Sequence, residues 1–246
     1  MRKLILILGI LVSLAAAQIV FGQVPEGSIS YEVKVNMHRT LPPERQEMKQ
    51  MLPEFNTYQD RLVFRGAESL YKSLEDESED EFSDDGGNVR MRIRRPNIEY
   101  YFNHDETKRI LSQEFFGKQY LIEDTIKVLP WKLGSETKNI QGYLCKQASY
   151  FNEERKQNIV AWYTDQLKPF LGPENYNSLP GTVLQIDIND GERTITAKKV
   201  EFTPLKKGDL KRPSSGQKTT EQEFRKIREE QMKRAGANGN VIIRNN

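Results

Sequence analysis

Alternation of apolar and polar residues is the dominant pattern along this 246-residue chain. From Ser28 to Met37 every second residue is apolar, which is typical of a strand with one buried face and one wet face. The same period of two returns in further segments, which cover residues 58–64, 70–74, 98–104, 108–116, 119–123 and 184–188. Short polar or glycine-containing turns separate most of them. We therefore predict a mainly β protein.

Interruptions of this pattern predict local irregularities. Pro43 to Leu52 is flanked by prolines and carries apolar residues at helical spacing, which predicts a short helix. Asn189-Asp190-Gly191 predicts a hairpin turn. Beyond this turn, Ile195 and Phe202 belong to opposite parities, and the change falls at Lys198-Lys199. A β-bulge is the simplest structure that reverses the parity within one strand.

The segment from Ile159 to Tyr163 differs from the other strands because it is apolar on both faces. Such a strand is expected at the centre of a sheet. We therefore expect Trp162 to be buried in the main core, with its indole N–H bonded to an acceptor.

Together these segments predict about ten strands. No strand–helix–strand alternation occurs, so a parallel sheet is not expected. The expected architecture is a large curved antiparallel sheet, either a half-open or a split barrel, with one or two short helices. This β-rich domain should occupy residues 23–204. Residues 205–246 should form a basic linker, a weakly docked helix beginning with the Thr220/Glu223 capping box, and a mobile tail.

Residues 1–22 have the features of a secretory signal peptide. Arg2 and Lys3 precede an apolar run, and cleavage is expected before Gln23, with Gln18 as the alternative. An uncleaved anchor is the other interpretation, although the run is shorter than the ~20 residues that a span needs. No later segment is apolar enough to cross a bilayer. The mature protein is therefore expected in the periplasm or outside the cell.

Charge and cysteine content narrow the functional classes. The chain has 37 Lys and Arg against 35 Asp and Glu, and loss of Arg2 and Lys3 leaves 35 against 35. A neutral protein offers no electrostatic support for binding nucleic acid. Cys145 is the only cysteine, so no internal disulfide forms. We interpret Cys145 as a small buried side chain, and an intermolecular thiol role stays open.

The turn at Leu179-Pro180-Gly181 is the sharpest corner predicted in the chain. Pro-Gly suits the central pair of a type II turn, which is a purely structural interpretation. The alternative is a ligand site beside the long loop 165–178. The residues that would line this site are Trp162, Tyr163, Phe170, Tyr176, Leu179, Pro180 and Gly181.

Two charged segments follow one another before residue 95. The acidic run from Glu75 to Asp85 is either a solvated loop or a calcium site, and it lacks the spacing of an EF-hand loop. Arg90, Arg92 and Arg94 alternate with apolar residues and either pair with the acidic run or form an anion-binding face.

No catalytic or cofactor motif is present, including metalloprotease, nucleophile-elbow, phosphate-loop and dinucleotide patterns. We expect no cofactor and assign no catalytic residue. The enzymatic alternative is a hydrolase that uses Asp or Glu side chains with His104, which ends an aromatic strand next to Asp105 and Glu106.

The segment from Ile140 to Phe202 resembles the core of the GLPGLI family. The resemblance rests on Gly142-Tyr143, Cys145, Ala148, Ala161-Trp162-Tyr163-Thr164, Gly172-Pro173 and Leu179-Pro180-Gly181. It implies an exported protein of a Bacteroidetes-type envelope, with a TonB-dependent outer-membrane receptor as a partner, and it assigns no biochemical role. The expected function is therefore a non-catalytic binding or accessory protein of the cell envelope.

Overall fold

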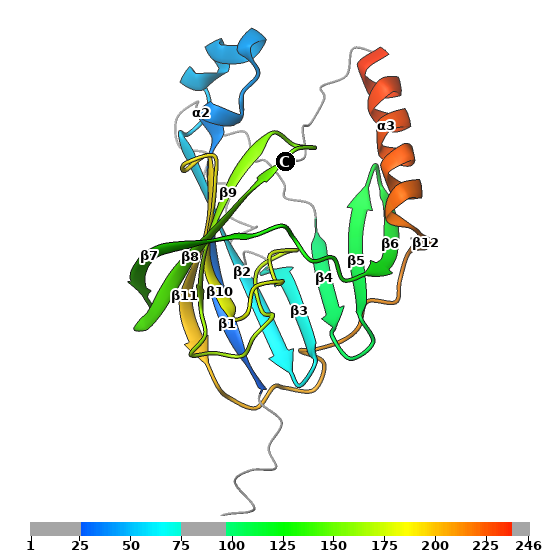
Figure 1. Cartoon of the computed structure of the whole chain (residues 1–246). Coiled ribbons are helices and arrows are strands. Elements are labelled where there is room, and N and C mark those ends of the chain that lie inside the picture. Colours follow the sequence, from blue (N-terminus) through cyan, green and yellow to red (C-terminus); the bar gives the residue numbers. More distant parts are fainter. Residues whose placement is uncertain (1–25, 75–96, 238–246) are drawn as a thin grey trace, which may run out of the picture.

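The computed structural model describes residues 26–74 and 97–237, which form one large β-sheet with a few helices (Figure 1). The predicted mainly β architecture is confirmed. The expected signal peptide, the acidic run 75–85, the face formed by Arg90, Arg92 and Arg94, and the last nine residues lie outside the described residues.

Twelve strands make up the sheet. They are β1 (Glu26–Asn36), β2 (Phe55–Arg65), β3 (Glu68–Ser73), β4 (Ile98–Asn103), β5 (Lys108–Phe115), β6 (Lys118–Thr125), β7 (Lys132–Ile140), β8 (Tyr143–Asn152), β9 (Gln157–Thr164), β10 (Thr182–Ile188), β11 (Arg193–Glu201) and β12 (Gln217–Thr219). The helices are α2 (Met37–Thr40), the 3₁₀ helix η1 (Pro43–Gln50) and α3 (Glu221–Ala237). None of these described helices has the length and apolar character that a membrane span requires.

The strand order is β12-β6-β5-β4-β3-β2-β1-β11-β10-β9-β8-β7. Strands β1 to β6 form one antiparallel meander and β7 to β11 form a second, and the two meet where β1 pairs with β11. Strand β12 adds a parallel pair with β6, which the prediction of an antiparallel sheet did not include. The sheet is therefore mixed, and it does not close into a barrel.

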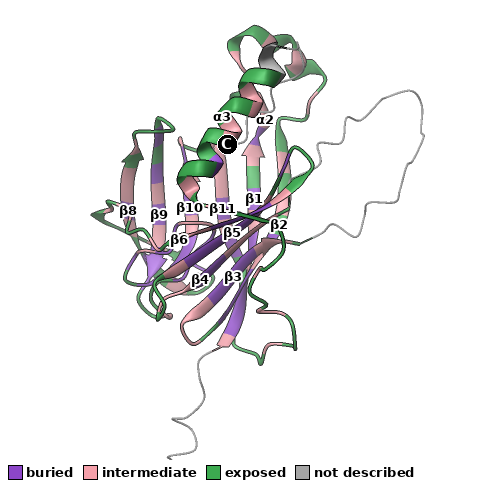
Figure 2. Cartoon of the chain, turned by 90° about the vertical axis from the view of Figure 1, so that its right-hand side faces the viewer, coloured by how far each residue is buried: buried purple, intermediate pink, exposed green. Residues whose placement is uncertain are grey.

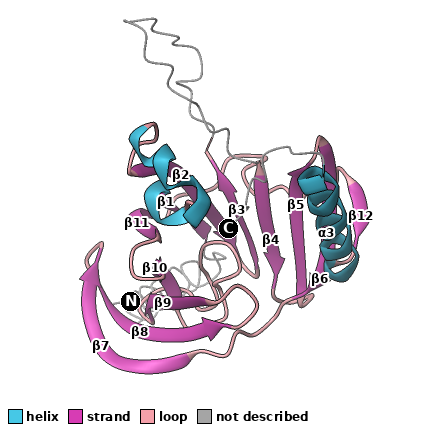
Figure 3. Ribbon diagram, turned by 90° about the horizontal axis from the view of Figure 1, so that it is seen from above, coloured by secondary structure: helices cyan, strands magenta, loops and turns pink. Residues whose placement is uncertain are grey.

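The connection between the two meanders shows that the sheet is strongly curled. Strands β6 and β7 lie near opposite edges, so a flat sheet would separate them by roughly 48 Å at about 4.8 Å per strand. Residues 126–131 join them, and an extended link of this length reaches only about 25 Å. Figure 3 shows the result from above, with β7 and β8 arching at one end and β4 to β6 standing at the other.

Strands β5 and β6 are covered on both faces. On one face, Phe224 of α3 is buried against Phe115 and Tyr120. Figure 2 shows α3 mainly in the exposed and intermediate colours, with a buried patch near its base. On the other face, Leu205 and Leu210 pack on a cluster of residues from β2 to β6. The basic segment after residue 204 therefore covers the sheet, although its composition predicted only a linker.

Several local predictions are confirmed. Asn189-Asp190-Gly191 joins β10 to β11, as predicted, with positive φ at all three residues. Strand β1 pairs Ser30 with Lys199 and Tyr31 with Ala197, so the extra residue of the bulge is Lys198.

Three further local predictions concern a short helix, a helix cap and a thiol. The predicted helix at 43–52 is the 3₁₀ helix η1, which buries none of its residues. Glu223 and Thr220 form the predicted capping box at the start of α3, with reciprocal bonds of 3.0 and 3.2 Å. Cys145 is fully buried, as expected, and burial raises the pKa of its thiol to about 11.

The prediction of a central, doubly buried strand at Ile159–Tyr163 is wrong. Strand β9 is third from the β7 edge, and only Ile159, Ala161 and Tyr163 are buried, while Val160 and Trp162 on the opposite face are half-buried. Lys138 lies over the Trp162 ring, with its Nζ 4.0 Å from the ring centroid. Trp162 is therefore a partly covered surface residue, because neither α3 nor the 205–210 segment extends over β9.

We accordingly expect Trp162→Ala to lower the free energy of unfolding by only about 1–2 kcal/mol, the sum of partial burial and one cation–π contact. Ile159→Ala, on the buried face of the same strand, should cost more, about 2–5 kcal/mol. Denaturant unfolding of both variants tests this order. Equal losses would show that the outer face of β9 is as tightly packed as the inner one.

Candidate functional site

A polar cleft lies where the two meanders face each other across the curl. It contains two adjoining cavities of about 110 Å³ and about 190 Å³, which share Arg109, Lys127, Leu129 and Asn175. The smaller cavity is completed by Phe102 and Asn177. The larger cavity is completed by Tyr100, Tyr150, Asn152, Glu154, Arg155, Glu174, Tyr176, Glu221 and Arg225.

These residues come from segments that are distant in sequence. Strands β4 and β5 provide Tyr100 and Arg109, whereas the β8–β9 turn and the 165–181 loop provide the opposite wall. Helix α3 closes the larger cavity through its first turn. Glu221 pairs with Arg109, and Arg225 contacts Glu154 at 3.2 Å. The helix therefore ties β5 to the β8–β9 turn.

Tyrosine side chains form the aromatic part of the larger cavity. Burial raises the pKa of Tyr100, Tyr150 and Tyr176, so all three phenols stay protonated at neutral pH. Trp131 supports two of them edge-on, with ring centroids 4.7 Å from Tyr150 and 6.4 Å from Tyr176. Its indole N–H donates to Ser178 Oγ at 3.1 Å. The cavity thus presents fixed phenol groups that can donate and accept hydrogen bonds.

A buried ion pair underlies this aromatic wall. Arg193 at the start of β11 donates through both terminal nitrogens to the carboxylate of Glu174, and each side chain is only 14% exposed. Nearby, Tyr71 donates to the fully buried Asp60 at 2.5 Å. Glu174 has a positive φ of 52°, so the 165–181 loop holds its carboxylate toward Arg193 at some cost in backbone conformation.

The Leu179-Pro180-Gly181 corner is a packing feature of the fold. Leu179 is buried, Pro180 is exposed, and a Cβ on Gly181 would lie 2.2 Å from the Thr164 carbonyl oxygen. Gly181 does not have the positive φ that the predicted type II turn would require. Close backbone approach, and not a left-handed conformation, explains the glycine.

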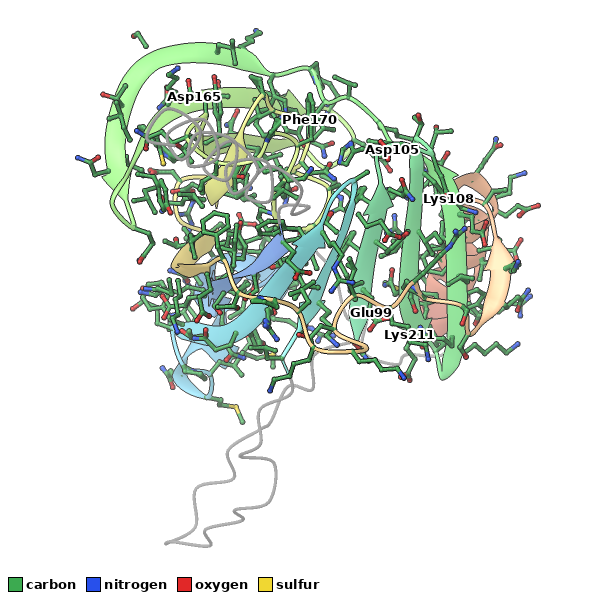
Figure 4. The ribbon with its side chains drawn as sticks, turned by 90° about the horizontal axis from the view of Figure 1, so that it is seen from below. Glu99, Asp105, Lys108, Asp165, Phe170 and Lys211 are labelled. Carbon is green, nitrogen blue, oxygen red and sulfur yellow. The ribbon has the colours of Figure 1, made fainter. Side chains whose placement is uncertain are left out.

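The residues proposed from sequence as a ligand site are not brought together in one cleft. Tyr176 lines the larger cavity, whereas Trp162 lies on the outer face and Tyr163 and Leu179 belong to the core. Phe170 is exposed at the tip of the loop, where Figure 4 labels it beside Asp105. Its ring lies 5.6 Å from that of His104.

His104 lies outside both cavities. Burial and the charge of Lys168 lower the pKa of its imidazole, which is therefore neutral at pH 7. In the described part of the chain no group of three His, Cys, Asp or Glu residues is arranged to hold a metal ion.

Most residues of the cleft were not predicted from the sequence. Arg109 had a detectable signal, because it shares the parity of Leu111 and so places a guanidinium on a buried face of β5. Glu174 and Asn175 carried no such signal, because they lie in a loop without periodicity. Their role depends on contacts with β11 and β5, which are far away in sequence.

Comparison with known proteins identifies a similar fold and does not identify an activity. No protein-family model matches the chain, and no curated protein matches it. Two solved structures of PNGF-II, in the P21 and C2 space groups, are similar with a TM-score of 0.56 and 16% sequence identity. The match covers 82% of this chain but only 33% and 32% of the PNGF-II chain. The chain therefore spans about a third of that protein and shares its fold over this part.

Proposed function

We propose that this chain is an exported, non-catalytic binding protein of the cell envelope, and that the cleft holds a small polar ligand. The observation that carries the proposal is the concentration of hydrogen-bonding side chains on the cleft walls. Tyrosines, asparagines and arginines from both meanders and from α3 converge there. A concave site with convergent polar groups is the usual form of a ligand pocket.

The charges of the cleft favour binding over proton transfer. Each acidic residue of the larger cavity has a cationic partner: Glu174 pairs with Arg193, Glu221 with Arg109 and Glu154 with Arg225. An arginine paired with a carboxylate fixes the position of both side chains, whereas a general acid or base must be free to exchange a proton with its substrate. The paired groups are thus suited to orienting a ligand.

The envelope location is supported by the signal-like residues 1–22 and by the resemblance to the GLPGLI family. A TonB-dependent outer-membrane receptor is the proposed partner, and the ligand would be a peptide, a lipid or a metal chelate. Native mass spectrometry of protein purified from its own cells should reveal the co-purifying ligand. The proposal would be contradicted if the purified protein had the mass of the chain without a ligand and if no partner could be crosslinked to it in the cell envelope.

Arg155 offers a direct test of the cleft. Its side chain lines the larger cavity and forms no ion pair with any described residue, and its charge acts on Tyr100, Tyr150 and Tyr176. Arg155→Ala should therefore reduce the amount of co-purified ligand about tenfold, as expected for loss of one charge-assisted hydrogen bond. The melting temperature should stay unchanged because the residue is exposed.

The neighbouring Lys156 provides the matched control. It is exposed in the same turn, pairs with Glu153 and does not line the cleft. Lys156→Ala should retain the full amount of ligand. Equal ligand content in the two variants would place the ligand elsewhere on the protein.

A further inference from the structure

Two buried hydrogen-bond donors of the smaller cavity have no partner among the described residues. They are Nε of Arg109 and Nδ2 of Asn177. Arg109 is only 6% exposed and Asn177 only 2%. Buried polar atoms in folded proteins are nearly always hydrogen-bonded, so two orphaned donors in one cavity indicate a group that the cavity is built to receive.

The remaining contacts of Arg109 fix the direction of its free N–H. Its Nη1 donates to Asn175 Oδ1 at 3.0 Å, and its Nη2 donates to Glu221. The guanidinium is therefore held through its terminal nitrogens, and Nε is the nitrogen that has no partner among the described residues. A guanidinium commonly serves two carboxylates in this way, because its five donors lie in one plane.

The chemistry of the cavity selects the kind of acceptor. Both orphaned groups are donors, and no carboxylate lines the smaller cavity within residues 26–74 and 97–237. Lys127 adds a cation at the rim, and Asp124 offsets part of its charge through an ion pair at 3.1 Å. Phe102 and Leu129 form apolar walls. Glu221 offsets part of the charge of Arg109, but its side chain is 33% exposed and is screened by water.

An anion is therefore favoured over a neutral acceptor, and a carboxylate over a phosphate. Two fixed donors match the two oxygens of a carboxylate, whereas a phosphate presents three or more oxygens that all need donors. The volume of about 110 Å³ also suits a small planar group with apolar walls on its sides.

We propose that the smaller cavity binds the carboxylate group of the cleft ligand through Arg109 Nε–H and the Asn177 amide, with Lys127 at the rim. This inference rests on the proposed binding function and names the chemical class of its ligand. A carboxylic acid with a polar remainder fits the two cavities together, with its acid group in the smaller one and the remainder among the tyrosines.

The test is a titration of the ¹⁵N-labelled protein with sodium acetate at constant ionic strength, followed through the Arg109 Nε–H and Asn177 side-chain resonances. Acetate should shift both signals, and acetamide, its neutral counterpart, should leave them in place. Equal shifts with both compounds would mean that the cavity recognises a neutral acceptor as well as an anion, which would overturn the assignment of a carboxylate. Shifts with inorganic phosphate alone would overturn the carboxylate assignment, and no shift with any probe would mean that water satisfies the donors.

Two variants with a matched control locate the binding. Asn177→Asp keeps the shape but replaces the amide with a carboxylate, so acetate affinity should fall at least tenfold. Lys127→Met should weaken it about threefold because this lysine is more than half exposed. Lys132→Met, exposed on β7 outside the cleft, should have no effect. If thermal melting shows that Asn177→Asp does not fold, the difference in acetate affinity between Lys127→Met and Lys132→Met tests the proposal by itself.

The outcome can be separated from that of the proposed function. A co-purified ligand that depends on Arg155 but carries no carboxylate would overturn this inference and leave the binding function intact. Acetate shifts in a protein that retains no native ligand would support the cavity assignment and count against the wider proposal.

Discussion

Replacing Gly181 with alanine is expected to lower the free energy of unfolding by at least about 3 kcal/mol, because its new methyl group would overlap with the backbone. The Cβ would lie 2.2 Å from the Thr164 carbonyl oxygen and 3.0 Å from a ring carbon of Tyr163. The Thr164 carbonyl belongs to β9 and cannot rotate away. Strands β9 and β10 would have to separate at Thr164 and Thr182, which pair there.

Gly134 on β7 is the matched control. A Cβ there would meet the end of the flexible Gln147 side chain at 2.6 Å, and that side chain can move into solvent. Gly134→Ala should therefore change the unfolding free energy by less than about 1 kcal/mol. Chemical denaturation of both variants measures the difference. A mild effect at Gly181 would mean that the corner yields easily and does not clamp the 165–181 loop.

The second large effect is expected for Arg193→Met. This change removes the cation that holds the Glu174 carboxylate in a site where both side chains are 14% exposed. Loss of one member of a buried ion pair typically costs about 3–5 kcal/mol, because the remaining charge loses its main compensation. The wall formed by Tyr100 and Tyr176 should loosen at the same time, since the pair lies beneath it.

The double variant Arg193→Met/Glu174→Gln separates the two contributions. Removing both charges should restore a large part of the lost stability, because neither member of the pair is then left as a buried charge without its partner. A double-mutant cycle from urea denaturation gives the coupling energy directly. Additive losses would mean that the two residues stabilise the protein independently.

Local features of the fold were predictable from sequence. The bulge at Lys198 was predicted because one extra residue reverses the parity of all that follow, and this leaves a clear mark in the pattern. The turn at Asn189-Asp190-Gly191 was predicted because few residues tolerate positive φ. Both signals arise within a few residues of the feature itself.

Features that depend on packing between segments far apart in the sequence were not predictable. Leu205 and Leu210 are isolated apolar residues in a basic segment, and only the sheet beneath them makes them part of a core. Trp162 shows the opposite error. It was expected to be buried because its strand is apolar on both faces, but the second face is buried only where another layer covers it. The candidate site shares this difficulty, since the pairing of Arg109 with Glu221 joins residues 112 positions apart.

The pairing of β1 with β11 has a consequence for how the protein folds. This central pair joins Ser28 to Glu201, so one edge of β1 stays open until residue 201 has been synthesised. Such a topology has a high contact order, which slows folding because a long loop must close before its contacts form. The β1–β2 hairpin can form early, but it then presents an unpaired strand edge, a known site of aggregation. The open edge of β1 is therefore an aggregation risk until β11 pairs with it.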